Sequence, residues 1–505
     1  MGRQLGSSDG ENISDEVATW AKLRPHTQAL CNGKRSLTFD ELENAIVNAQ
    51  IEIAGLGFNA GDRVLVVGEN SIDFSVFLLA AARMRLILVL VNARQTSIEI
   101  QKTISHSEPL GQFYFHDHSV ESAEHSIIFK ASIRNSPSFG EFGFIKSEIR
   151  KTLPIDPKIF AIIYTTGTTG SPKGVMLTHS NLRFIAKMMH QLREINPNDR
   201  VLAILPISHV MGLASVFLGA LYSGAAVYFL PKFTSSVCLE FIKKYQITVL
   251  QGAPIMFSKL VSHVLDKKLN GFTSLRFLGS GGAPISKKLK EDVFLIFANE
   301  LQNGYGLTEI PSISWTRFND GTLDDSVGLP LPGVEVEFRK SDGTLAKVGE
   351  VGELWTRGPN LMSGYFKNPE LTSQLIDGQG WFNSQDLGYI NPNGHLYIVG
   401  REKDMIIRSG FKVYPLEIES VLLSHPYIQQ AAVIGYPISG NEEVWAFIEG
   451  HKDHILSIDE INSYLNLQLS PYKRPSKIIL VENLPLAANG KVLKSKLMSE
   501  FIQKD

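Results

Sequence analysis

Short apolar runs alternate with amphipathic stretches along the first large part of the chain, from about residue 62 onward. Runs such as 64–68 and 86–91 have the length of buried strands, whereas 96–107 and 181–192 have the apolar spacing of helices. Strands that alternate with helices form mostly parallel sheets with helices on both faces. We therefore expect an α/β fold whose ligands bind in loops at the carboxyl ends of strands.

The pattern changes twice toward the C-terminal end. Between residues 321 and 402, shorter alternating strands with frequent turns, such as 352–358, predict a small antiparallel, barrel-like subdomain. From residue 403 a mixture of helices and strands predicts a small α+β domain, whose length of about a hundred residues is a common domain size. We thus predict a large domain at 1–402 and a small C-terminal domain at 403–505.

Composition narrows the class of protein. The 505 residues are 44% hydrophobic and 20% charged, and the formal net charge is −2, so neither a nucleic-acid footprint nor a polybasic membrane patch is indicated. The two cysteines, Cys31 and Cys238, lack metal-site spacing and are typical of reduced thiols. The N-terminus lacks a signal-peptide pattern, and no apolar run spans a bilayer. We expect a cytoplasmic protein without a transmembrane segment, and a homodimer is compatible with the sequence.

The first chemical signal is YTTGTTGSPKG at 164–174, which follows an apolar run. It is not a Walker A loop, because Lys173 does not directly follow a glycine and no Ser or Thr comes after it. Its glycines let the backbone turn tightly, and its hydroxyls and lysine supply donors for phosphate. A surface turn rich in threonine and glycine is the alternative interpretation.

YTTGTTGSPKG closely resembles the phosphate loop of the adenylate-forming superfamily, which contains acyl- and aryl-CoA ligases, luciferases and peptide-synthetase adenylation domains. Further motifs of that family follow in the family's order. They are GSGGAP at 279–284, NGYGLTE at 303–309, GWFNSQDLG at 380–388, GREKDMIIRSGFKVYPLEIE at 400–419 and LPLAANGKVLKSKL at 484–497.

The resemblance implies an ATP site. Tyr305 would stack on adenine, Thr308 would contact the α-phosphate, and Glu309 with Thr165 would hold Mg²⁺, a cation that prefers oxygen ligands. The residues that the resemblance places around the nucleotide are Thr165, Thr166, Gly167, Thr168, Thr169, Lys173, Gly281, Gly282, Ala283, Asn303, Gly304, Tyr305 and Gly306.

The resemblance also implies that Asp386 and Arg401 bind the ribose. The sequence departs from the family at Asn383, Ser384 and Gln385, where an Arg-Thr-Gly triplet is usual, so the path of this loop is open. A carboxylate can accept hydrogen bonds from two ribose hydroxyls whatever residues precede it, provided that it is itself correctly placed. Asp386 therefore stays a predicted ribose ligand. Its alternative is a solvated turn aspartate.

The remaining motifs concern the small domain and the acceptor. By resemblance, Lys403 lies at the hinge about which a mobile C-terminal domain pivots. The resemblance also implies that Lys491 reaches the active site during adenylation and that His209 stands as a gate between the acyl pocket and the phosphates. The residues expected to face CoA are Ser409, Gly410, Phe411 and, from the large domain, Lys232.

These parts predict an ATP-dependent carboxylic acid–CoA ligase. The acid would attack ATP to give acyl-AMP and pyrophosphate, and the CoA thiol would then displace AMP. A stand-alone acyl-AMP ligase that loads a carrier protein, and a non-catalytic nucleotide-binding homologue, are the alternatives. The expected acyl pocket shows no arginine that could pair a second carboxylate, which favours a fatty or aryl acid over a malonate-type diacid. Its expected residues are Met211, Gly212, Ala214, Gly279, Gly281, Gly306 and Leu307.

Overall fold

The computed structural model describes most of the chain. The described residues are 12–147, 156, 158–166, 172–317, 324–409, 411–438, 441–451, 454–486, 492–494 and 496–497. Within them, none of the helices is both long and apolar enough to cross a bilayer.

An eight-stranded sheet forms one half of the large domain, in the order β19-β9-β8-β4-β3-β5-β7-β6. Its central strands run parallel, and antiparallel strands close both edges. The central strands are mostly apolar and buried because both faces of a parallel sheet are covered. The strands are β3 (Arg63–Gly68), β4 (Ile87–Asn92), β5 (Gly111–Phe115), β6 (Ser132–Ser136), β7 (Gly140–Lys146), β8 (Ile159–Thr166), β9 (Pro172–Thr178) and β19 (Gly364–Tyr365).

A nine-stranded sheet forms the other half, in the order β16-β15-β14-β13-β12-β10-β11-β1-β2. Its strands β10 to β14 run parallel, and the ends of the adjacent strands β13 and β14 carry the glycine motifs. The strands are β1 (Gln28–Cys31), β2 (Ser36–Thr38), β10 (Arg200–Ala203), β11 (Ala226–Phe229), β12 (Val249–Gly252), β13 (Phe277–Gly281), β14 (Leu301–Tyr305), β15 (Ser314–Trp315) and β16 (Leu329–Pro330).

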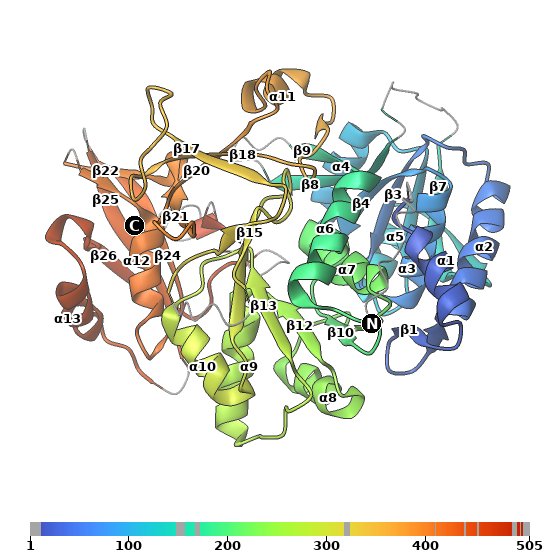
Figure 1. The fold of residues 1–505 in the computed structure, drawn as a ribbon, viewed down its shortest axis with the longest axis horizontal. Helices are drawn as coiled ribbons and strands as arrows, with labels where there is room; N and C mark the ends of the chain where they lie inside the picture. Colours follow the sequence, from blue (N-terminus) through green and yellow to red (C-terminus); the bar gives the residue numbers. More distant parts are fainter. Residues whose placement is uncertain are drawn as a thin grey trace.

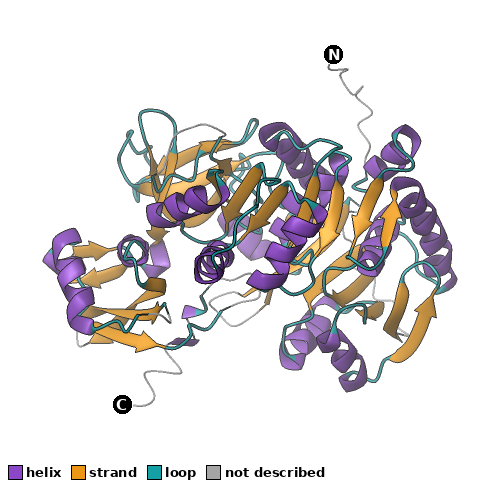
Figure 2. Ribbon diagram, turned by 90° about the horizontal axis from the view of Figure 1, so that it is seen from below, coloured by secondary structure: helices purple, strands orange, loops and turns teal. Residues whose placement is uncertain are grey.

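Helices pack against the strands of both sheets (Figure 2). Several begin at a side-chain cap; in α6, Thr178 and Asn181 form a reciprocal capping box that satisfies two backbone donors. The helices of the large domain are α1 (Asp15–Leu23), α2 (Phe39–Gly55), α3 (Ile72–Arg83), α4 (Ser97–Ser107), α5 (Val120–Ile128), α6 (His179–Arg193), α7 (Gly219–Tyr222), α8 (Ser235–Tyr245), α9 (Pro254–Lys267), α10 (Lys287–Phe297) and α11 (Pro369–Leu375).

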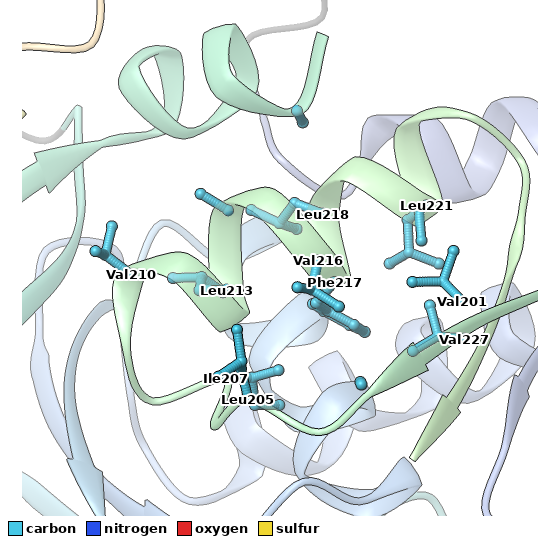
Figure 3. Close-up of a cluster of buried hydrophobic side chains, with 14 of the residues drawn as sticks. Val201, Leu205, Ile207, Val210, Leu213, Val216, Phe217, Leu218, Leu221 and Val227 are labelled. Carbon is cyan, nitrogen blue, oxygen red and sulfur yellow. The ribbon is translucent and has the colours of Figure 1, made fainter. Parts of the chain in front are cut away.

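A π-helix, η1 (Met211–Leu218), follows the turn after β10. The sequence predicts a helix here, and the structure makes it a π-helix that continues into α7. Figure 3 shows its apolar side chains, including Leu213 and Phe217, packed with those of the neighbouring strands. Short π-helical segments are frequent at functional sites.

The predicted antiparallel subdomain is a four-stranded sheet in the order β17-β18-β20-β21. Its strands are β17 (Glu335–Arg339), β18 (Gly352–Arg357), β20 (Phe382–Ile390) and β21 (Leu396–Arg401). The hairpin of β20 and β21 carries the aspartate motif on one strand and the start of the hinge motif on the other.

The C-terminal part of the chain has its own core. It lies across the molecule from α1 and α2 (Figure 1), and a three-stranded sheet with helices on it builds this core. These observations confirm the predicted α/β class, while the boundary at residue 403 stays a prediction. The elements are η2 (Glu402–Asp404), β22 (Ile406–Arg408), β23 (Phe411–Val413), α12 (Pro415–Leu423), β24 (Ile428–Ile438), β25 (Asn441–Gly450), α13 (Ile458–Gln468), η3 (Pro471–Lys473) and β26 (Lys477–Val481).

Candidate active site

Three residues predicted from separate motifs meet at one carboxylate. Asp386 on β20 is the register partner of Arg401 on β21, and the Arg401 Nε donates to Asp386 Oδ1 at 2.9 Å. The hydroxyl of Tyr305, at the end of β14, donates to Asp386 Oδ2. The Asp386 side chain is only 4% exposed. The structure therefore brings the predicted adenine and ribose residues together.

Electrostatics keep Tyr305 a hydrogen-bond donor. Burial, reinforced by the negative charge of Asp386, raises the pKa of Tyr305 well above its ordinary value. The neutral phenol can then donate to Asp386, which as a carboxylate still has lone pairs for further donors. Two ribose hydroxyls are donors of the kind that such a carboxylate accepts.

The unusual triplet ahead of Asp386 orders the loop in its own way. The Asn383 Oδ1 accepts from the Gln385 N–H at 2.7 Å, where Gln385 has a left-handed φ of +60°. The Ser384 Oγ accepts from the Asp386 N–H at 3.1 Å and donates to the Leu354 carbonyl at 2.8 Å. The departure from the family pattern thus supplies the bonds that position Asp386.

Contacts of Tyr365 join Glu309 to the end of the β8–β9 hairpin, which carries the predicted phosphate loop. Tyr365 donates to Glu309 Oε1 at 2.8 Å, and the Lys173 Nζ lies 6.0 Å from the centre of the Tyr365 ring. Lys173 is the register partner of Thr165 across β8 and β9. Burial, and then the charge of Glu309, raise the pKa of Tyr365, so it also stays a neutral donor.

Glu309 and Thr165 suit Mg²⁺ by their chemistry. Mg²⁺ binds through one or two carboxylates together with phosphate oxygens and water, rather than in an all-protein cage. The described residues contain no cluster of three or more metal-ligating His, Cys, Asp or Glu side chains. Tyr365 was not predicted, because a tyrosine that follows a glycine has no sequence signature for a contact with Glu309.

Several predicted residues lie outside the described part of the chain. They are Gly167, Thr168, Thr169, Gly410 and Lys491, together with the side chain of Thr166. The roles assigned to them stay predictions.

The glycines of the motifs occupy places where a side chain would not fit. A Cβ at Gly304 would lie 1.9 Å from the Trp315 ring, and one at Gly306 would lie 2.3 Å from the Ser312 nitrogen. Gly281 faces Gly304 across the parallel strands, and a Cβ there would lie 2.8 Å from the Gly304 carbonyl oxygen. These glycines are therefore explained by close packing at the strand ends.

Gly282 and Asn303, from the same motifs, have local structural roles in the fold. Gly282, which precedes Ala283, has a φ of +82°, the left-handed region that favours glycine. The Asn303 side chain is buried and donates to the Ser326 carbonyl at 3.1 Å. Its described bond holds the strand end in place. The predicted contact of Asn303 with the nucleotide is untested, as is that of Thr308.

His209 lies in the turn between β10 and η1. Its N–H donates to the Pro206 carbonyl at 3.0 Å, and its carbonyl accepts from the Leu213 N–H at 2.9 Å. Asn70 braces the same turn, since it donates to the Leu205 carbonyl at 2.8 Å and accepts from the Ile207 N–H at 2.8 Å. His209 is thus held at the strand ends, where its role as a gate was predicted.

Lys403, on η2, is influenced by the charges of two residues that are predicted to bind the nucleotide. Burial, with the positive charges of Arg401 and Lys173 added, lowers the pKa of Lys403. Lys403 follows Arg401, a predicted ribose ligand, by two residues.

The residues expected to face CoA lie on two parts of the chain. The Ser409 N–H donates to Asn441 Oδ1 at 2.7 Å, and the Phe411 ring stacks on Tyr472 with 4.6 Å between centroids. Phe411 stays 52% exposed. Lys232, on the large domain, is exposed and lies 3.6 Å from Glu121.

Comparisons with known proteins agree with these motifs. The family model for AMP-binding enzymes matches residues 17–366, and the model for the C-terminal domain of AMP-binding enzymes matches residues 417–491. The chain is 31% identical to a probable CoA ligase, CCL5, of Humulus lupulus, over 97% of this chain and 93% of that protein.

Two solved structures resemble the whole chain. ATP-bound MatB from Rhodopseudomonas palustris has a TM-score of 0.84 and 28% identity, and the match covers 97% of this chain and 99% of that one. O-succinylbenzoate CoA synthetase from Bacillus subtilis, in complex with ATP and magnesium ion, has a TM-score of 0.80 and 26% identity, with 95% and 98% covered.

Proposed function

Because this chain belongs to the AMP-binding enzyme family, we propose that it is an ATP-dependent carboxylic acid–CoA ligase that works through an acyl-AMP. The observation that carries the proposal is the meeting of Tyr305, Asp386 and Arg401 at one buried carboxylate. Glu309, which accepts from Tyr365, and Lys173, which lies near the Tyr365 ring, are the residues that we propose for the phosphates.

In the first half-reaction, a carboxylate oxygen of the acid attacks the α-phosphorus of ATP. The bond between the α-phosphorus and the bridging oxygen breaks, and pyrophosphate leaves with its electron pair. Lys173, Thr308 and Lys491 supply donors where negative charge accumulates. Bound Mg²⁺, held by Glu309 and Thr165, would neutralise phosphate charge.

In the second half-reaction, the thiol of CoA attacks the acyl carbon and AMP leaves. The new carbon–sulfur bond gives the thioester, and the thiol proton passes to solvent. We propose that the small domain, 403–505, turns about Lys403 between the two steps, so that Lys491 serves the first and the face with Ser409 and Phe411 serves the second. His209 would separate the acid from the phosphates.

The acid would lie between η1 and the ends of β13 and β14. Met211 borders this space, since its Sδ lies 3.6 Å from the position of a Cβ on Gly281. A cytoplasmic location and a homodimer stay predictions of the sequence.

A panel of carboxylic acids tests the proposal. Each acid is incubated with ATP and Mg²⁺, with and without CoA, and pyrophosphate, AMP and thioester are measured. Acid-dependent release of pyrophosphate and CoA-dependent formation of thioester and AMP are expected. Formation of ADP, or thioester only with an acyl-carrier protein, would contradict the proposed ligase.

A further inference from the structure

A two-residue connection joins β22 to β23 in the C-terminal part of the chain. The strands pair antiparallel up to Arg408 and Phe411, so residues 409–410 link them. Ser409, the first of these, has a left-handed φ of +51°. Two-residue hairpin connections favour such a φ, but serine is a poor residue for it, because its Cβ makes the left-handed region unfavourable. The conformation of Ser409 therefore needs support from neighbouring groups.

Asn441, the first residue of β25, supplies that support. Its Oδ1 accepts a hydrogen bond from the Ser409 N–H at 2.7 Å, and its Nδ2 lies 3.5 Å from the Ser409 Oγ. The neighbouring Glu442 Oε2 accepts from the Ile407 N–H at 2.6 Å. A hydrogen bond from a backbone N–H to a carboxylate is of the strong, charge-assisted kind. Two adjacent side chains of β25 thus fix the backbone that leads into the turn.

The two residues that flank the turn are held by other side chains. The Arg408 guanidinium lies 2.9 Å from the Glu443 carboxylate. On the other strand, the Phe411 ring stacks on Tyr472 with 4.6 Å between their centroids. A substitution at Asn441 would therefore remove the support of the turn and leave the anchors of both flanking residues in place.

The predicted ribose loop has the same arrangement as this turn. Gln385, which precedes Asp386, has a left-handed φ of +60°, and its N–H donates to Asn383 Oδ1 at 2.7 Å. Elsewhere, left-handed residues commonly end helices, where this conformation is usual. They include Glu108, Glu194, Gln246, Lys268 and Ala298. Ser409 and Gln385 thus share a left-handed backbone held by an asparagine, and both lie in loops that are predicted to meet a ligand.

The turn that Asn441 supports lies at the surface. Ser409 is exposed, and so are the register partners Ile407 and Lys412 on one face of the hairpin. Phe411, on the other face, is 52% exposed. Apolar surface beside a positive charge suits CoA, which joins a thiol-bearing arm to anionic phosphates. The hairpin therefore offers CoA a surface whose turn is fixed from β25.

We propose that Asn441 is a positioning residue for the thioester-forming step, because it holds Ser409 in the conformation in which the turn meets CoA. The inference rests on the proposed function and adds a residue to its second half-reaction. Asn441 acts through Ser409 and not by contact with the reacting atoms. The first half-reaction, between the acid and ATP, uses other residues and does not depend on Asn441. The residue lies outside every motif quoted from the sequence, so only the structure connects it to the turn.

Two substitutions test the inference: Asn441→Ala removes the acceptor for the Ser409 N–H, and Asn441→Asp keeps one. Thioester formation from supplied acyl-AMP and CoA should fall about tenfold in Asn441→Ala, since the loss of one hydrogen bond changes an equilibrium by up to about that factor. Asn441→Asp should restore most of the rate. Acid-dependent exchange of pyrophosphate into ATP, without CoA, should stay unchanged in both variants. Asn462→Ala, at an exposed position of α13, is the control and should match the wild type in both steps.

Two further measurements need no turnover. The Ser409 N–H should exchange its hydrogen about tenfold faster in Asn441→Ala than in the wild type, and calorimetric titration with CoA should give a Kd about tenfold higher. An equal loss in both half-reactions, or an unchanged rate of thioester formation in Asn441→Ala, would overturn the inference. If no acid yields pyrophosphate or thioester, the proposed function fails, and the titration then decides this inference separately. A wild type that does not bind CoA, or an equal Kd in the two proteins, would refute it.

Discussion

Asp386 and Arg401 face each other across the hairpin of β20 and β21, with 2.9 Å between Oδ1 and Nε. Because the next residues form η2, which contains Lys403, the pair joins the predicted ribose site to the predicted hinge. Tyr305 reaches the same carboxylate from the nine-stranded sheet. One aspartate therefore links two sheets close to the predicted start of the small domain.

Asp386→Asn should weaken ATP binding. The change removes the negative charge that accepts from Arg401 and, in our account, from the ribose. Hydrogen bonds to charged groups contribute about 1.5–3 kcal/mol, so the KM for ATP should rise about 10–100-fold. Steady-state kinetics with varied ATP measure this. Glu335→Gln, which removes an exposed carboxylate on β17 of the same sheet, is the control, and an unchanged KM in Asp386→Asn would refute the ribose assignment.

Tyr365→Phe should raise the Mg²⁺ concentration required for activity. The tyrosine donates to Glu309 at 2.8 Å, and groups that orient a metal ligand typically change affinity 10–100-fold when they are removed. Pyrophosphate release against Mg²⁺ at saturating ATP measures the effect. Tyr228→Phe, which removes a comparable hydroxyl bound to Gln28 on β1, is the control. Equal Mg²⁺ dependence in both variants would argue against Glu309 as a metal ligand.

His179 should make the fold sensitive to acid. Burial, with the positive charges of Arg85 and Arg183, lowers the pKa of His179 from 6.5 to about 3, so the folded protein holds it neutral. Because the pKa of His179 is lower in the folded state than in the unfolded state, neutral His179 makes its full contribution to the free energy of unfolding above pH 6.5. That contribution is lost as the pH falls toward 3. At pH 5 the loss amounts to about 2 kcal/mol.

Urea unfolding at pH 8 and pH 5 measures the contribution of His179. His179→Asn keeps an acceptor near the Ile13 N–H, which binds the ring Nδ1 at 3.4 Å, and it should reduce the difference between the two pH values by about 2 kcal/mol. Replacement of the exposed His26 by asparagine should leave the difference unchanged. The assignment fails if both variants behave alike.

The sequence predicted the architecture and the nucleotide motifs because both depend on local patterns. Continuous apolar runs such as 64–68 indicate a parallel sheet that is covered on both faces. Glycines such as Gly304 and Gly306 occupy places where the backbone closely approaches another group. The motifs also predicted Tyr305, Asp386 and Arg401 as nucleotide-binding residues, and the structure brings these three side chains together.

Contacts between distant segments could not be predicted. Asn383 and Ser384 looked like a departure that put the aspartate loop in doubt, and only the bonds to Gln385 and Asp386 show how they order it. The burial of Arg193 against Trp315 depends on the pairing of β14 with β15, which no local pattern records.

Lys491→Ala should separate the two half-reactions. In our account Lys491 stabilises the departing pyrophosphate, and loss of one such donor typically costs about 10²–10³ in rate. Acid-dependent pyrophosphate release should therefore fall by that factor, while the attack of CoA on supplied acyl-AMP should change little. Lys496→Ala, on the same segment, is the control. Equal loss in both half-reactions would contradict the assignment of Lys491.

Exchange of labelled pyrophosphate into ATP, without CoA, tests the central claim most directly. If the acid is activated as an acyl-AMP, the label should enter ATP only when the acid is present, because the first step then reverses on the enzyme. CoA should instead divert the intermediate to thioester and AMP. If the enzyme converts acids to thioesters but none of these acids supports the exchange, the acyl-AMP mechanism is contradicted.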